Sequence, residues 1–177
     1  MPKHRWSILC LRGAIDKYSN ELSILLVKDE LTIPPILQPL PANPVLSVEL
    51  QLVSTWDRDA VQQPEKFWTS VSVTTPNGED FLVGDSILSA SLEDKVKTRL
   101  IYQFETIPYR GTGLYQFNVE VGDDPAGPFR AVAHVPLEIK TQGVGAITAA
   151  STAPEQPSEP TPSAPRKSSS RRGRARP

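Results

Sequence analysis

Apolar and polar side chains alternate along most of the chain before residue 141. Residues 113–121 (GLYQFNVEV) show the pattern most clearly, because every second position from Tyr115 to Val121 is apolar. The positions between them are Gln116, Asn118 and Glu120. A period of two places successive side chains on opposite faces of an extended chain, so the segment is predicted to be a strand with one buried face. We interpret its apolar face as part of a core and not as a surface that holds a ligand.

Short runs rich in β-branched and aromatic residues recur between Gly, Pro, Asn and Asp residues, a punctuation typical of all-β proteins. No run shows a long helical period. The further predicted strands are residues 6–12, 22–27, 45–53, 67–74, 81–83, 86–92, 96–104 and 129–139. The run 22–27 is almost continuously apolar, and the run 6–12 is its expected partner.

Three turn or break signals separate these strands. Asn77-Gly78 predicts a hairpin, because both residues tolerate the positive φ of tight primed turns. Residues 34–44 hold five prolines in eleven residues, which predicts an extended crossover from one sheet or edge to another. Pro136 predicts an edge position or a bulge in the last strand, because proline donates no hydrogen bond to a ladder.

About seven to nine strands with polar outer faces fit an all-β, antiparallel two-sheet sandwich of the immunoglobulin-like or C2-like kind. A barrel is the alternative. Beyond Lys140 the aromatic residues disappear, and Pro, Ser, Thr and Ala dominate. Such a segment has too little to bury to offset its ordering entropy. We therefore predict a sandwich domain over residues 1–140 and a disordered tail over residues 141–177.

The net charge of −1 hides a difference between these two parts. The basic residues of the tail are Arg166, Lys167, Arg171, Arg172, Arg174 and Arg176. Such a cluster can attract nucleic-acid phosphates without sequence preference, so nucleic-acid association through the tail is one functional hypothesis. The tail can equally be a solvated terminus, a protein contact or, through the serines between its arginines, a phosphorylation site.

Cys10 is the single cysteine, which excludes an internal disulfide and a multi-cysteine zinc site and suits a reducing compartment. The apolar run at residues 8–11 ends at Arg12 and is too short for a secretion signal or a membrane span. We therefore expect a cytoplasmic protein without membrane contact. Pairing of exposed sheet edges is one way for such a sandwich to form oligomers.

Candidate catalytic groups are few. His4 and His134 are the two histidines, and neither lies in a recognisable nucleophile motif. Cys10 lies in an apolar run and is expected to be an inert core residue. The glycine pair at residues 110–113 (RGTG) lacks the lysine and helix of a phosphate-binding loop and predicts a tight turn. We therefore expect no enzymatic activity, no catalytic residue and no cofactor.

Carboxylates in predicted loops support a different hypothesis, because loops at one end of a sandwich can present the oxygen ligands that calcium requires. These residues are Asp57, Asp59, Asp85, Asp123 and Asp124. No spaced ligand series is present, and acidic residues are also common in solvated loops. We predict no metal site and keep a metal-dependent enzyme or a calcium-binding sandwich as an alternative.

The tryptophans are expected to anchor the core, with one exception. Trp56 lies beside charged residues in a predicted loop (TWDRDAVQQPE), so Trp56 and Arg58 are the predicted contacts to a partner. The alternating strands account for most apolar residues, and no set of reactive groups converges. The leading hypothesis is therefore a binding or assembly module with a protein partner.

A family of small bacterial β-sandwich-like proteins of unknown function resembles this chain in four segments. They are ILCLRGAIDKYSNELSILLVKDELTIPP, VLSVELQLVSTWDR, the PNG turn and GTGLYQFNVEV. In that family a strand, a short turn, an apolar strand and a proline step open the domain, and a Gly-x-Tyr-x-Phe strand comes late. The resemblance covers residues 5–140, implies the same fold and assigns no activity.

Overall fold

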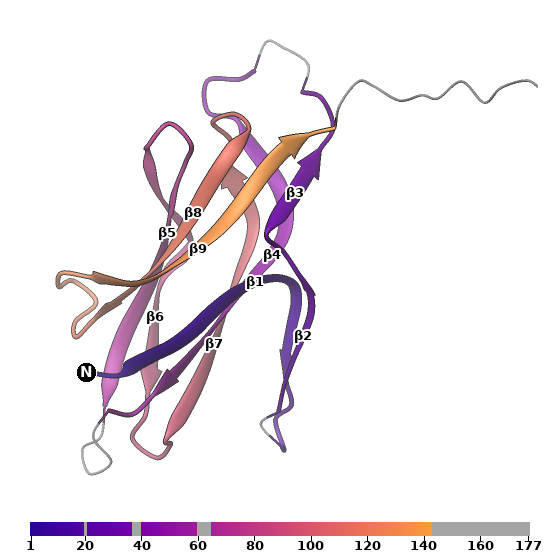
Figure 1. The fold of residues 1–177 in the computed structure, drawn as a ribbon. Helices are drawn as coiled ribbons and strands as arrows, with labels where there is room; N and C mark the ends of the chain where they lie inside the picture. The colour runs from indigo at the N-terminus through magenta and orange to yellow at the C-terminus, as the bar shows by residue number, and fades with distance from the viewer. Residues whose placement is uncertain (20, 37–39, 60–64, 143–177) are drawn as a thin grey trace, which may run out of the picture. The chain divides into compact units, whose positions relative to one another are not determined.

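The computed structural model describes residues 1–19, 21–36, 40–59 and 65–142 of the 177-residue chain. Within these residues the chain forms nine strands and no helix (Figure 1). The strands are β1 (Lys3–Ile15), β2 (Leu22–Val27), β3 (Glu30–Ile33), β4 (Val45–Asp57), β5 (Lys66–Thr74), β6 (Asp80–Ser91), β7 (Lys97–Pro108), β8 (Gly113–Gly122) and β9 (Arg130–Thr141). β9 ends just beyond the predicted boundary at residue 140, and the predicted disordered tail lies outside the described residues.

The strands form two sheets. Sheet A has four strands in the order β2-β1-β4-β7, and sheet B has five in the order β3-β9-β8-β5-β6. Neighbouring strands are antiparallel except β3 and β9, which run parallel. The predicted two-sheet sandwich is confirmed. The sequence pattern does not predict β3, because a strand of four residues is too short to show a period.

The two sheets share a core. The inner side chains of β8 are those predicted, since Tyr115, Phe117 and Val119 are fully buried and Val121 is nearly so. The ring centroid of Phe104 in β7 lies 5.4 Å from that of Phe117, so aromatic rings of the two sheets meet. Complete burial of a side chain of this size contributes about 1.5–3 kcal/mol to stability, and this shared layer holds the sheets together.

A hydrogen bond also crosses the core between the sheets. The phenol of Tyr102 in β7 donates to Oγ1 of Thr69 in β5 at 2.5 Å. Burial raises the pKa of Tyr102 to about 12, against the opposing effect of its hydrogen bonds with Thr69 and Ser54. The phenol therefore stays protonated in the folded chain well above neutral pH.

The hairpin predicted at Asn77-Gly78 is confirmed between β5 and β6, but its turn is of another type. Gly78 has a φ of 84°, whereas Asn77 does not have a positive φ. The N–H of Gly78 donates to the Thr75 carbonyl and the N–H of Thr75 to the Glu79 carbonyl, each at 2.9 Å. This pattern is a type I turn followed by a left-handed glycine, with Pro76 at its first central position. Only Gly78 takes a positive φ, so the predicted hairpin closes without the primed two-residue turn that Asn-Gly also favours.

Proline marks two breaks in the sheets, as predicted. The proline-rich segment leads from β3, which ends at Ile33 in sheet B, to β4, which begins at Val45 in sheet A. Pro136 pairs with Gln116 of β8, and β3 joins the other side of β9 only from Glu138 onward. On that side Pro136 has no strand partner among the described residues, which is the predicted edge position.

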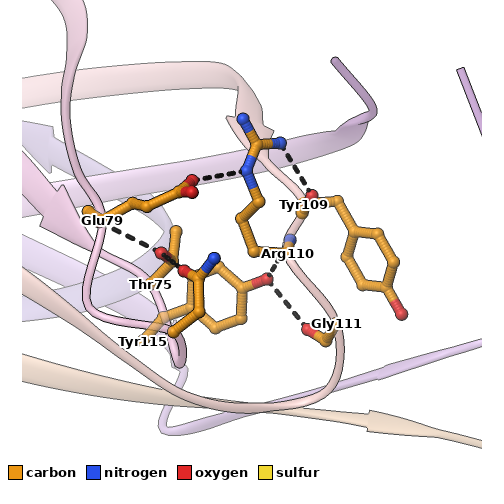
Figure 2. Close-up of polar contacts among 7 residues, drawn as sticks. Thr75, Glu79, Tyr109, Arg110, Gly111 and Tyr115 are labelled. Atoms are coloured by element: carbon orange, nitrogen blue, oxygen red, sulfur yellow. Dashed lines mark hydrogen bonds and ion pairs between the residues drawn. The ribbon is translucent and has the colours of Figure 1, made fainter. Parts of the chain in front are cut away.

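A tyrosine fixes the turn before β8. The phenol oxygen of Tyr115 accepts a hydrogen bond from the N–H of Arg110 and donates one to the carbonyl of Gly111, each at 2.9 Å (Figure 2). Arg110 also pairs with Glu79 at 2.7 Å, and its guanidinium lies 4.8 Å from the ring centre of Phe81. A tyrosine hydrogen-bonded to the backbone just upstream of its strand resembles the tyrosine corner of immunoglobulin-like sandwiches. The turn at residues 110–113, which Tyr115 holds in place, is the tight turn predicted for the glycine pair.

Candidate functional site

Trp56 is a core residue. β4 continues to Asp57, so Trp56 lies in a strand, and its side chain is 0% exposed. Its Nε1 donates to Oγ of Ser54 at 2.8 Å, and its ring centre lies 5.2 Å from that of Phe67. The prediction of Trp56 as a loop residue that contacts a partner is wrong. Charged neighbours in the sequence do not prevent burial when the strand alternation turns the ring inward.

Arg58 follows β4 and holds the connection between β6 and β7. Its guanidinium donates to the backbone carbonyls of Leu92 and Glu93, the latter at 2.6 Å. Its backbone N–H donates to the Val96 carbonyl at 2.9 Å. These bonds give Arg58 a structural role, and its contact with a partner stays a prediction.

Two of the five predicted loop carboxylates are engaged with the protein itself. Asp57 pairs with Arg5, with 2.6 Å between Oδ2 and Nε, and Asp124 accepts a backbone N–H of its own turn at 2.7 Å. The others are Asp59 and Asp123, which are exposed, and Asp85, whose side chain lies outside the description. Among the described residues, no three His, Cys, Asp or Glu side chains gather closely enough to hold a metal ion.

Two serine hydroxyls on the outer face of sheet B hydrogen-bond to one carboxylate. Glu120 of β8 accepts hydrogen bonds from the hydroxyls of Ser70 and Ser72 of β5, at 2.9 and 3.4 Å. Ser70 is 2% exposed and Ser72 is 9% exposed, although both lie on an outer face. A buried donor without a partner costs about 1–3 kcal/mol, so Glu120 stabilises this part of the sheet.

His134 belongs to the same outer face. Its Nδ1 lies 2.8 Å from Oδ1 of Asn118 and 3.1 Å from Nε2 of Gln116. Asn118 is 8% exposed and donates through Nδ2 to Oγ1 of Thr74 at 2.9 Å. Within the described residues no hydroxyl or thiol hydrogen-bonds to this imidazole, and a nucleophile–base pair needs such a bond. We call the side chains of Ser70, Ser72, Thr74, Gln116, Asn118, Glu120 and His134 the polar network.

His4 and Cys10 lie in β1. Nε2 of His4 lies 2.8 Å from Oγ of Ser7, and its ring meets that of Trp56 edge-on at 5.0 Å. Burial lowers the pKa of His4, which favours the neutral imidazole. Cys10 is fully buried, as predicted, and burial raises the pKa of its thiol. Both groups are therefore held in their neutral forms.

The first two strands form an arm that leaves the ladder of sheet A. β1 pairs with β4 as far as Cys10, and beyond this residue β2 is its only strand partner in the described part of the chain, up to Ile15 opposite Leu22. The predicted pairing of these two strands is confirmed. Figure 1 shows β1 bending along its length, so that its second half runs beside β2. We call residues 10–27 the arm.

Gly13 lies where the arm packs against the outer face of sheet A. A Cβ added at this position would lie 2.8 Å from Cγ2 of Val53 and 3.7 Å from Cδ1 of Ile101. The Gly13 N–H donates to Oε1 of Gln51 at 2.6 Å. This close approach requires a residue without a side chain, so glycine allows the arm to lie against β4 and β7.

The edge strand of the arm exposes apolar side chains. Leu25, Leu26 and Val27 are 56%, 68% and 55% exposed. β2 is the terminal strand of sheet A, so its second edge has no strand partner within the described residues. Leu26 has a φ of 57°, an unfavourable conformation for leucine that interrupts the regular ladder. Exposed apolar residues on an unpaired edge are typical of a contact surface.

Sequence reasoning missed this surface, although the signal is present. The run 22–27 is almost continuously apolar, and such a run is equally typical of a strand buried on both faces. Only the tertiary structure shows that β2 is the terminal strand of its sheet and that four of its six side chains are exposed.

Asp16 closes the turn of the arm. Its Oδ1 accepts hydrogen bonds from the N–H of Ser19 at 2.7 Å, the N–H of Tyr18 at 2.9 Å and the hydroxyl of Ser19 at 3.1 Å. These bonds, with the Ser19 N–H first, lower the pKa of Asp16 and favour its ionised form. The turn is therefore ordered by a charged side chain, while the neighbouring Tyr18 is 86% exposed.

The six basic residues predicted to contact anions, at positions 166–176, lie outside the described residues, so that contact stays a prediction. The described part of the chain contains no helix with the length and apolar character needed to cross a membrane. Comparisons of the chain with protein-family models, curated proteins and solved structures find no match.

Proposed function

We propose that this protein is a non-enzymatic binding module that contacts a protein partner through the β2 edge of the arm. The observation that carries the proposal is the row Leu25, Leu26 and Val27, each more than half exposed on an edge with no strand partner in the described residues. Covering apolar surface stabilises a complex by about 25 cal/mol per Å². A partner that covers these side chains therefore lowers the free energy of the complex.

Strand addition is the binding mode that fits this edge. An unpaired strand presents N–H and C=O groups to a second extended chain, and the side chains beside the edge supply specificity. Because Leu26 interrupts the ladder, we expect the incoming segment to pair over only a few residues. Its affinity then depends on apolar contacts with Leu25 and Val27.

Charges at the ends of β2 favour a different protein over a second copy of this chain. A symmetric antiparallel pair with Leu25 opposite its own copy places Glu21 of each copy opposite Asp29 of the other. Like charges directly opposite one another destabilise a strand pair. The proposed partner is therefore an extended apolar segment of another protein.

Selection of random peptides displayed on phage against the full-length chain tests this proposal. We expect enriched peptides to be rich in β-branched and aromatic residues and to slow amide exchange in β2. The double variant Leu25→Thr/Val27→Thr keeps β-forming residues but removes apolar surface, and it should weaken peptide binding about ten-fold or more. The matched control is Leu114→Thr, because Leu114 is 59% exposed in β8 and should not affect binding.

Two results would overturn the proposal. One is that no peptide is enriched, or that the enriched peptides bind the double variant as tightly as the original chain. The other is a dimer, measured by light scattering, that is lost in the double variant, because it would make a second copy the occupant of the edge.

A further inference from the structure

A basic pocket lies between the turn of the arm and the start of β7. It is open to solvent and has a volume of about 610 Å³. Its arm side consists of Ile15, Asp16 and Lys17, and its other side is the run 95–99 (KVKTR). Two segments that are far apart in the sequence therefore build one pocket.

The lining of this pocket is strongly positive. Lys17, Lys95, Lys97 and Arg99 face a single lining carboxylate, Asp16, which leaves a net charge of +3. Oδ1 of that carboxylate already accepts three hydrogen bonds within the turn of the arm. The acidic pair at residues 93–94 directly precedes the run but does not line the pocket.

The three pocket lysines form no ion pair with another described residue. Lys140, on sheet B, shows the contrasting case, because it pairs with Glu30 and Glu138 at 2.6 and 3.1 Å. Unpaired charges of one sign in a pocket raise the local concentration of counter-ions, and an anion that reaches all of them relieves their repulsion.

The size and chemistry of the lining favour a compact ligand with several phosphate groups. A phosphate group carries about −1.5 to −2 charges at pH 7 and three acceptor oxygens, so linked phosphates match several cations within a short distance. Lysine ammonium groups are established phosphate donors. None of the lining residues in the described part is aromatic, so the pocket offers no stacking platform for a base.

We propose that this basic pocket is a binding site for a small polyphosphate-bearing ligand. The proposal does not depend on partner binding at β2, because the pocket is lined by the turn of the arm and by the run 95–99, and not by the apolar row. A bound polyphosphate would join the arm to β7. It should therefore slow amide exchange in both.

Isothermal titration of the full-length chain with inorganic tripolyphosphate tests the site. The triple variant Lys17→Gln/Lys95→Gln/Lys97→Gln should bind about ten-fold more weakly, since it removes three of the four cations that line the pocket. The control variant changes Lys3, Lys28 and Lys66 to Gln and loses the same charge outside the pocket, so its affinity should change less than about two-fold. Both variants keep the basic tail, so a difference between them reports the pocket alone.

Parallel titrations identify the source of the phosphates. Tighter binding of a nucleoside triphosphate than of tripolyphosphate would support the site and assign a nucleotide. Tighter binding of inositol trisphosphate would support it and assign a lipid headgroup. Equal weakening in the two triple variants, or citrate binding as tight as tripolyphosphate, would overturn the proposal.

Discussion

The outer faces of the two sheets differ in whether their side chains are hydrogen-bonded within the domain or left exposed to solvent. On sheet B, Ser70, Ser72 and Asn118 are nearly inaccessible, and they bond to Glu120 and to other members of the polar network. On sheet A, the arm exposes residues 25–27, and the pocket beside its turn holds three lysines that form no ion pair with a described residue. Polar side chains that hydrogen-bond to one another are satisfied without a partner protein. Exposed apolar side chains are stabilised when a partner covers them. This difference is why we propose the arm as the part of the domain that binds a partner.

Both outer faces rest on one core, and Trp56→Ala, which has the largest expected effect, tests whether they unfold together. Removal of this fully buried ring should lower the free energy of unfolding by about 3–5 kcal/mol. Urea unfolding followed by circular dichroism measures the loss, and amide exchange should rise in the arm and in the polar network together. Trp6→Ala is the matched control, because Trp6 is 40% exposed and should cost far less. Separate unfolding of the two faces would contradict a shared core.

Tyr102 links the two sheets and gives the domain a predicted sensitivity to alkali. Its folded pKa of about 12 lies above the ordinary value of 10.0, so its contribution is complete below pH 10 and is lost as pH rises through the folded value. We expect stability to fall by about 2 kcal/mol between pH 10 and 12 from this group. Urea unfolding across this range measures the slope.

Tyr102→Phe is the control for this prediction. The variant should be less stable at neutral pH, because Thr69 loses its hydrogen-bond partner, but its stability should fall less steeply in alkali. An equal slope in both chains would show that another group titrates.

Substitution should lower the free energy of unfolding much more in the polar network than in the apolar row of the arm. Asn118→Ala leaves the hydrogen-bond partners of a buried amide unsatisfied, so it should cost about 1–3 kcal/mol of unfolding free energy. Leu25→Thr/Val27→Thr removes exposed side chains and should change stability by no more than about 0.5 kcal/mol. Thermal unfolding compares the two. A larger loss in the arm variant would mean that the apolar row serves folding instead of binding.

The close contact between Gly13 of the arm and Val53 of β4 gives the smallest and most local effect on stability. Gly13→Ala adds a Cβ that lies 2.8 Å from Val53, so the arm or the valine must shift, at a cost of about 1 kcal/mol. We expect faster amide exchange within the arm and unchanged exchange in β8. Ala14→Ser, on the next and exposed residue, is the control. Unchanged exchange in the arm would show that other contacts hold it.

Most of the strand framework could be predicted, because alternation along a strand is a local property. The predicted run 22–27 has the bounds of β2, while the runs 81–83 and 86–92 join into β6. The end of β4 could not be predicted, because residues 53–56 are buried on both faces of the strand, so their burial does not alternate although successive side chains still point to opposite faces. Of the predicted partner contacts, Trp56 fails for the same reason.

The sequence by itself determined that this chain is an all-β sandwich with turns at defined glycines and prolines, since period and backbone freedom are encoded within a few neighbouring residues. The tertiary structure alone decided which apolar strand meets solvent, which serines are buried, and that Lys17 lies in one pocket with Lys95 and Lys97. The physical reason is that exposure and local charge depend on contacts between residues far apart in the chain, and alternation carries no information about those contacts.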